Sequence, residues 1–385
     1  MDQRRAVAGG GERRTLLRSV AAGSTVVLSG ATGAPWVTST QTATRTRAYV
    51  LAIDGLRPDE IHPALTPRLA RLRAGGRWFP YAQAVGAPGR PTDLGIPTIV
   101  ERLQTLGLTT GTVLSTEHLY EAFGTRATYR WEPEPLLPVI EHALDSYTSA
   151  ALQAMVHDAD PDMVFVNFGD IGRSGHADVT GSSLRLTRRA ALANTDRIVG
   201  GFVDSLRSAG KWDRSVGMVL AHHSTDRADP DRPVSLGTAF ADDPLLAGNV
   251  AIADNGGANL LSWTGDPVDR AEAVRRMRTA ATGVRGVLAV HKPEDLRIGP
   301  RGGDLVAYCE AGRRFSDPQV CSDPAPDGQG RPPTAPIPFF LTGGSPLVRP
   351  ARSSEGATTA DVAPTIGEVF GLDVSDGGYD GTSRL

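Results

Sequence analysis

Short apolar runs that alternate with helical patterns constrain the fold of this 385-residue chain most strongly. Uninterrupted apolar runs are typical of parallel strands that are covered on both faces. Such runs lie at residues 48–53, 109–114, 163–168, 216–221 and 337–341, and helical patterns lie at 67–73, 98–106, 148–157, 184–207 and 271–281. Three of the helical patterns stop at a glycine, as helices commonly do. The alternation predicts a doubly wound α/β sheet.

Polar side chains follow several of these runs where the predicted strands end. Asp54 follows the first run, the loop after residue 168 contains Asp170 and His176, and His222 and His223 follow the run at 216–221. Ligands of open α/β sheets bind at the carboxyl ends of the strands, and Asp and His are ligands for divalent metals. We therefore expect a metal site there. A helix cap or a loop brace is the alternative for Asp170 and His176.

The two adjacent histidines pose a geometric question. Successive side chains of a strand point to opposite faces, so only one of His222 and His223 would reach a given metal. Both would reach it if the strand has already given way to a loop. The other histidine would otherwise be partly buried and bonded to the backbone.

Bulk composition narrows the class of protein. With 40% hydrophobic and 22% charged residues, the chain has the composition of a globular protein. A net charge of -3 provides no field that attracts nucleic acid or an anionic membrane, so a small substrate is the simpler expectation. Two cysteines, Cys309 and Cys321, exclude a thiolate metal cage, and a single loop-closing disulfide stays open.

The first residues have the pattern of an export signal. Arg13 and Arg14 precede an uncharged, small-residue apolar stretch at 19–34, which is shorter than the ~20 residues that a membrane span requires. We expect residues 1–37 to be a twin-arginine signal peptide and processing region, and 38–385 to be one domain without a membrane span. The protein would then be extracellular, cell-wall or periplasmic. A flexible basic tail is the alternative.

Residues 225–336 differ from the rest of the predicted domain. They are richer in loops, and they contain short β-like segments at 259–263, 286–290 and 305–308. The tract at 317–336 is rich in Pro, Gly and Asp, which is typical of a loop or linker. We interpret 225–336 as an insertion that covers the site.

Several motifs, taken in order, resemble one known family. They are VLAIDGLRPD at 50–59, TPRLARL at 66–72, SGH at 174–176, the strand leading to His223, and TADVAPT at 359–365. Together they resemble the type I phosphodiesterase/nucleotide pyrophosphatase branch of the alkaline phosphatase superfamily, over essentially the whole mature chain. The resemblance implies a three-layer αβα sandwich with a mostly parallel central sheet. It also implies two metal ions, usually zinc, and a Thr or Ser that attacks phosphorus.

Three metal-ligand positions of that family depart from its pattern here. Asp54, His176 and His223 match the family's ligands. However, Gly172 stands four residues before His176, where the family has Asp, and His222 replaces the Asp of an Asp-His pair. The family's C-terminal His falls at Gln329. With these departures from the family pattern, we expect one divalent ion, most simply zinc, rather than two.

The nucleophile segment also departs from the family. The turn at 86–93 runs directly into the helical pattern at 98–106, so a deletion of that segment is the simplest account. Thr92 is the candidate nucleophile, through its separation from Asp54 and its position near a helix start. The alternative is that Thr92 and Asp93 cap that helix.

The resemblance implies hydrolysis of a phosphoester or phosphoanhydride in a small phosphorylated molecule, such as a nucleotide or phosphodiester, with impaired catalysis. Asp54, His223 and His222 would hold the metal, and Asp170 and His176 would form a second, weaker site. A pseudoenzyme that binds a phosphorylated ligand or a protein partner without turnover is the alternative. An interaction module acting through the insertion is a third class.

Overall fold

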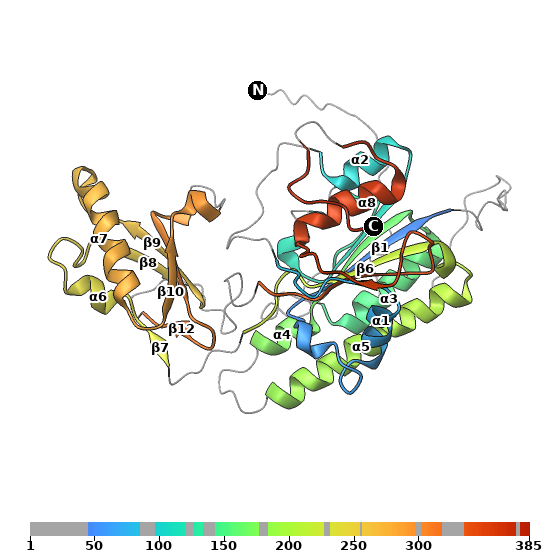
Figure 1. Cartoon of the computed structure of the whole chain (residues 1–385), viewed down its shortest axis with the longest axis horizontal. Helices are drawn as coiled ribbons and strands as arrows, with labels where there is room; N and C mark the ends of the chain where they lie inside the picture. The colour runs from blue at the N-terminus through green and yellow to red at the C-terminus, as the bar shows by residue number, and fades with distance from the viewer. Residues whose placement is uncertain are drawn as a thin grey trace, which may run out of the picture.

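A mixed sheet with helices on both faces forms the larger part of the molecule, at the right in Figure 1. The computed structural model describes residues 45–84, 97–120, 123, 126–133, 143–176, 184–226, 232–254, 256–296, 302–317, 335–374 and 378–385. Within these residues, eight strands pair in the order β14-β2-β13-β6-β1-β5-β3-β4. Their bounds are β1 Arg47–Ile53, β2 Arg77–Trp78, β3 Thr110–Leu114, β4 Tyr129–Trp131, β5 Met163–Phe168, β6 Ser215–Leu220, β13 Phe339–Thr342 and β14 Ala351–Arg352.

The sheet is parallel at its centre. Strand β1 is buried along its whole length and pairs in parallel with β5 on one side and β6 on the other. Strand β13 runs antiparallel to both β6 and β2. The mostly parallel sheet predicted from the apolar runs is thus confirmed, although the run at 337–341 belongs to the antiparallel strand.

Two helical layers enclose the sheet. Helices α1 (Pro67–Ala74), α3 (Asp145–Asp158) and α4 (Asp170–His176) pack on the long helix α5 (Leu184–Ser208) at one face. Helices α2 (Ile99–Thr105) and α8 (Val362–Phe370) pack together at the other face. The arrangement is the predicted three-layer αβα sandwich. Short 3₁₀ helices lie at Pro58–Glu60, Glu117–Leu119, Trp212–Arg214, Pro267–Asp269, Pro293–Leu296 and Thr359–Asp361.

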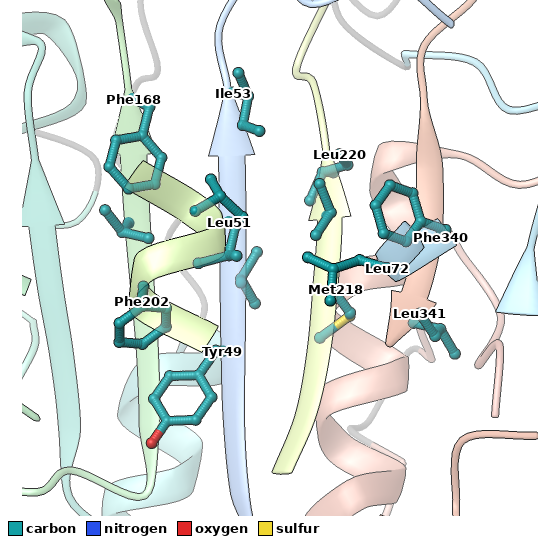
Figure 2. Close-up of a cluster of buried hydrophobic side chains, with 14 of the residues drawn as sticks. Tyr49, Leu51, Ile53, Leu72, Phe168, Phe202, Met218, Leu220, Phe340 and Leu341 are labelled. Atoms are coloured by element: carbon teal, nitrogen blue, oxygen red, sulfur yellow. The ribbon is translucent and has the colours of Figure 1, made fainter. Parts of the chain in front are cut away.

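Apolar side chains from alternate positions of β1 fix this packing (Figure 2). Tyr49 is buried, and its ring meets the ring of Phe202 from α5 edge to face, with 5.3 Å between centroids. Leu51 and Ile53 continue the same face of the strand and are also buried. Each such side chain stabilises the fold by about 1.5–3 kcal/mol. The carboxyl end of β1 is therefore rigidly placed.

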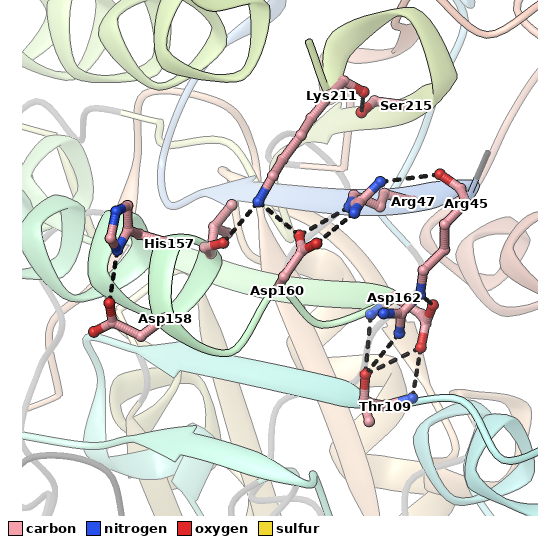
Figure 3. Close-up of polar contacts among 10 residues, drawn as sticks. Arg45, Arg47, Thr109, His157, Asp158, Asp160, Asp162, Lys211 and Ser215 are labelled. Carbon is pink, nitrogen blue, oxygen red and sulfur yellow. Dashed lines mark hydrogen bonds and ion pairs between the residues drawn. The ribbon is translucent and has the colours of Figure 1, made fainter. Parts of the chain in front are cut away.

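Charged side chains tie the opposite, amino-terminal edge of the sheet together (Figure 3). The buried guanidinium of Arg47 donates to the carboxylate of Asp160, which also accepts from Lys211 Nζ at 2.9 Å. Arg45 pairs with Asp162 beside it. This network joins the start of β1 to the loop before β5, far along the strand from Asp54.

Residues 233–315 build a second sheet with its own core. Strands β8 (Val250–Asp254), β9 (Ala258–Trp263), β11 (Leu305–Cys309) and β10 (Val287–His291) form an antiparallel sheet, with α6 (Gly237–Ala241) and α7 (Arg270–Gly283) alongside. Strands β7 (Pro233–Val234) and β12 (Arg314–Phe315) pair beside it. The three β-like segments predicted here correspond to β9, β10 and β11. The role of the insertion as a cover for the site stays a prediction.

Candidate metal centre

Asp54 lies directly beyond the carboxyl end of β1. Its backbone N–H donates to Phe168 O at 2.8 Å, so the end of β1 is bonded to the end of β5. Gly55 has a φ of +69°, a left-handed conformation that favours glycine, and it bridges to Ser224 beyond β6. Three central strands therefore meet at the Asp54-Gly55 turn, and the carboxylate of Asp54 is buried there.

Both histidines reach Asp54. Strand β6 ends at Leu220, and in the bend that follows the Nε2 atoms of His222 and His223 lie 3.4 and 3.5 Å from Asp54 Oδ1. The strand has thus given way to a loop, which is the arrangement that lets adjacent side chains converge. One ligand atom from each of these three residues lies within 4.8 Å of the others. Ligands about 2.0 Å from a tetrahedral zinc ion would be ~3.3 Å apart, which is close to the two distances from the histidines to Asp54.

The environment of His223 indicates which ring nitrogen faces the site. Nδ1 of His223 lies 3.2 Å from the carbonyl oxygen of Ser224, which can only accept a hydrogen bond. Nδ1 therefore carries a proton, and Nε2 is the ring nitrogen that faces Asp54. In a neutral ring, the lone pair of Nε2 would face the carboxylate, and a cation bound between the two groups would stabilise that arrangement.

Helix α4 packs against the Asp54-Gly55 turn at Gly172. A Cβ atom at Gly172 would lie 2.2 Å from Asp54 Oδ2, and one at Gly55 would lie 2.9 Å from the Cα of Gly172. Neither position accepts a side chain without a shift of its neighbours. The position where the family pattern places an Asp is thus occupied by backbone packed on Asp54.

Asp170 lies apart from this group. Its Oδ1 accepts from Arg173 at 2.7 Å and from the backbone N–H of Asp145 at 3.2 Å. The segment after β5, predicted as a loop, is helix α4, because Asp145 Oδ1 accepts the N–H groups of Gly169 and Asp170 at its start. Burial and the carboxylate of Asp170 raise the pKa of Asp145 to about 7. Asp170 therefore braces the start of α3, and its metal role stays a prediction.

Other predicted residues lie outside the described part of the chain. They include Thr92, Gln329, Cys321 and the signal region 1–37, while nothing is described of the side chain of His176. Cys309 is buried and its Sγ donates to Arg313 O at 3.0 Å. Among the described helices, none has the length and apolar character of a membrane span.

One residue near the site gave no sequence signal. Arg188 of α5 donates to both carboxylate oxygens of Glu60, at 2.6 and 2.7 Å, and to Gly55 O at 2.7 Å. Arg188 is one of several arginines in the first turns of α5, and no spacing distinguishes it from the exposed Arg189. Only the fold brings it beneath the Asp54-Gly55 turn.

Comparisons with known proteins bear on the fold and on the family. No curated protein matches the chain. The structure of murine ectonucleotide pyrophosphatase/phosphodiesterase 5 is similar, with a TM-score of 0.62 and 14% identity over 85% of this chain and 95% of its own. An inactive variant of that protein in complex with AMP gives a TM-score of 0.64 at 14% identity, over 86% of this chain and 96% of its own. Phosphonoacetate hydrolase from Sinorhizobium meliloti 1021, in complex with phosphonoformate, gives 0.54 at 14% identity, over 77% of this chain and 90% of its own.

At such identities the structural neighbours, which are alkaline phosphatase superfamily members, show the shared fold alone. The family assignment rests on sequence. The model of the type I phosphodiesterase/nucleotide pyrophosphatase family matches residues 107–323, more than half of the chain. The match spans β5, α4 and the His222-His223 bend. The chain therefore belongs to the type I phosphodiesterase/nucleotide pyrophosphatase family.

Proposed function

We propose that this protein is an exported metallohydrolase-like member of its family, with one divalent metal ion held by Asp54, His222 and His223 and with impaired catalysis. Its substrates would be phosphoesters or phosphoanhydrides of small molecules. The observation that carries the proposal is the approach of both imidazole Nε2 atoms, at 3.4 and 3.5 Å, to one oxygen of a buried carboxylate.

The donor set supports zinc. One carboxylate and two imidazoles are ligands that zinc accepts, and three protein ligands leave a position open. A divalent ion there would supply neutralisation of phosphate charge and activation of an oxygen nucleophile. The chain's own contribution is orientation: Ser224 O fixes the ring of His223, and Asp54 is held at the end of a buried strand.

The proposed impairment rests on the absence of a ligand at position 172, where the family has an Asp for its second metal ion. In-line displacement benefits from two cations, one at the attacking oxygen and one at the leaving oxygen. Gly172 offers no ligand, and α4 packs on Asp54 where a carboxylate would have to enter. Asp170 and His176 remain the candidates for a second, weaker site, and Thr92 remains the proposed nucleophile. With one well-formed site, the expected turnover is slow.

A pseudoenzyme is the second candidate, and the contact of Gly172 with Asp54 also favours it. Such a protein would bind a phosphorylated ligand or a protein partner without turnover. AMP is the first ligand to test, because a structurally similar protein was solved with AMP.

Export is proposed from residues 1–37. Arg13 and Arg14 and the apolar stretch behind them support the twin-arginine route. Replacing both arginines by lysine, which keeps the charge, is expected to leave the protein in the cytoplasm. Export of the double-lysine variant at the wild-type level would contradict the proposal.

Metal content tests the function most directly. The protein would be purified without chelator, and zinc, manganese and iron per chain would be counted by elemental analysis. We expect one equivalent in the wild type and none in His223→Ala, whereas His157→Ala, which removes an exposed histidine of α3, should keep the ion. Two equivalents would refute the single-ion site. If the protein contains no metal, the pseudoenzyme becomes the favoured function. Calorimetry would then test it by measuring whether the protein binds AMP.

A further inference from the structure

We infer that Arg188 is a positioning residue that holds the Asp54-Gly55 turn and helix α4 together, and so sets the metal affinity of the site. The inference rests on the proposed function, since it concerns the same ion. Arg188 contacts none of the three proposed ligands in the hydrogen bonds described, so it would act through the backbone that carries them.

One guanidinium joins three segments. Nε and Nη2 of Arg188 donate to the two carboxylate oxygens of Glu60, at 2.6 and 2.7 Å. Nη2 also donates to Gly55 O at 2.7 Å, and Nη1 lies 3.4 Å from Ile171 O. The carbonyls of Gly55 and Ile171 belong to the residues next to Asp54 and Gly172. Arg188 therefore holds both backbones whose separation fixes the position of the carboxylate.

The contact is largely shielded from water. The side chains of Arg188 and Glu60 are 18% and 10% exposed, and Glu60 also accepts the backbone N–H of Arg57 at 2.9 Å. Charge-assisted, two-pronged pairs of this kind are short and directional, and a guanidinium provides a planar fork that an ammonium cannot reproduce. The pair thus fixes the orientation of the Arg188 guanidinium, in addition to neutralising the charge of Glu60.

The hydrogen bond from Arg188 to Gly55 O lets variants distinguish a positioning role of Arg188 from a purely structural one. Removing Arg188 alone leaves Glu60 buried without its partner, which destabilises the protein whatever the site does. In Arg188→Met with Glu60→Gln, the uncompensated charge is removed as well. Stability should then largely return, but Gly55 O still lacks its donor. A role in positioning predicts that metal affinity does not return with stability.

The experiment measures zinc affinity by competition with a chromogenic chelator, together with urea unfolding, on the full chain. Groups that orient metal ligands typically change affinity by about 10–100-fold, so we expect at least about tenfold weaker binding in both Arg188→Met and the double variant. Arg189→Met is the matched control: Arg189 is exposed and makes no hydrogen bond or ion pair with described residues. It should bind zinc as the wild type does.

Wild-type affinity in Arg188→Met, or recovery of affinity together with stability in the double variant, would overturn the inference. If the wild type itself binds no metal, the proposed function fails, and hydrogen exchange then decides about Arg188. Faster exchange in peptides covering 54–60 and 169–174 in the double variant, relative to Glu60→Gln, would support its positioning role. Unchanged exchange there would refute it.

Discussion

Gly172→Ala tests whether the contact between α4 and Asp54 controls the site. The added Cβ would lie 2.2 Å from Asp54 Oδ2 and 2.6 Å from Cγ, more than 1 Å inside ordinary contact, so either α4 or the carboxylate must move. Overpacking of this kind destabilises by about 1–3 kcal/mol. Alanine in a helix regains up to about 1 kcal/mol relative to glycine. We expect a net loss of roughly 0–3 kcal/mol, with metal affinity falling at least about tenfold.

Gly201→Ala provides the matched control. Gly201 lies in α5, and a Cβ there would meet no atom within 4 Å. The same substitution should therefore raise the unfolding free energy by about 0.5–1 kcal/mol and leave metal binding unchanged. Urea unfolding and zinc titration by calorimetry measure both quantities. Wild-type zinc affinity in Gly172→Ala would show that zinc binding does not depend on the present position of the Asp54 carboxylate. The contact between α4 and Asp54 would then not control the site.

Three further outcomes are expected. Asp54→Asn should abolish the bound metal equivalent in elemental analysis, and a retained equivalent would place the ion elsewhere. Burial raises the pKa of Asp160, but hydrogen bonds from Arg47 and a neighbouring lysine lower it more, so the net pKa lies below its usual value. The stability gap between wild type and Asp160→Asn should therefore be complete above about pH 4 and shrink as pH falls through the folded pKa; a gap that widens in acid contradicts this. Asp196→Ala should reduce urea stability by about 1–2 kcal/mol, because Asp196 Oδ1 accepts the N–H of Leu69 at the start of α1; a loss below about 0.3 kcal/mol would be a failure.

The central strands could be predicted from sequence because both of their faces are buried. The run at 163–168 coincides with β5, and the run at 48–53 lacks only Arg47 of β1. Strand β2, with two residues, has no pattern to detect, since it exists only through pairing with β13 and β14. Helix α4 was predicted as a loop because its capping carboxylate, Asp145, comes from 25 residues earlier in the chain.

The site could be predicted as far as strand ends reveal it. Parallel strands bring their carboxyl ends to one edge, so Asp54 is expected near at least one of His222 and His223, and the structure brings all three together. The hydrogen bond from the backbone N–H of Asp145 to Asp170 and the contribution of Arg188 depend on contacts between segments far apart in the chain, which leave no periodic signal. Whether the three residues bind metal stays a prediction.

The glycine pair favours the proposed single-ion site over a two-ion site that has merely lost ligand side chains. If only a side chain had been lost at position 172, space for a carboxylate would remain. Instead, a Cβ there would collide with Asp54, and one at Gly55 would lie 2.9 Å from Gly172. Gly172→Asp alone is therefore expected to displace Asp54 and to reduce metal content, as counted by elemental analysis. A gain to two metal equivalents in this variant would show that helix α4 can move away from Asp54. It would also show that the second site lacked only a carboxylate at position 172.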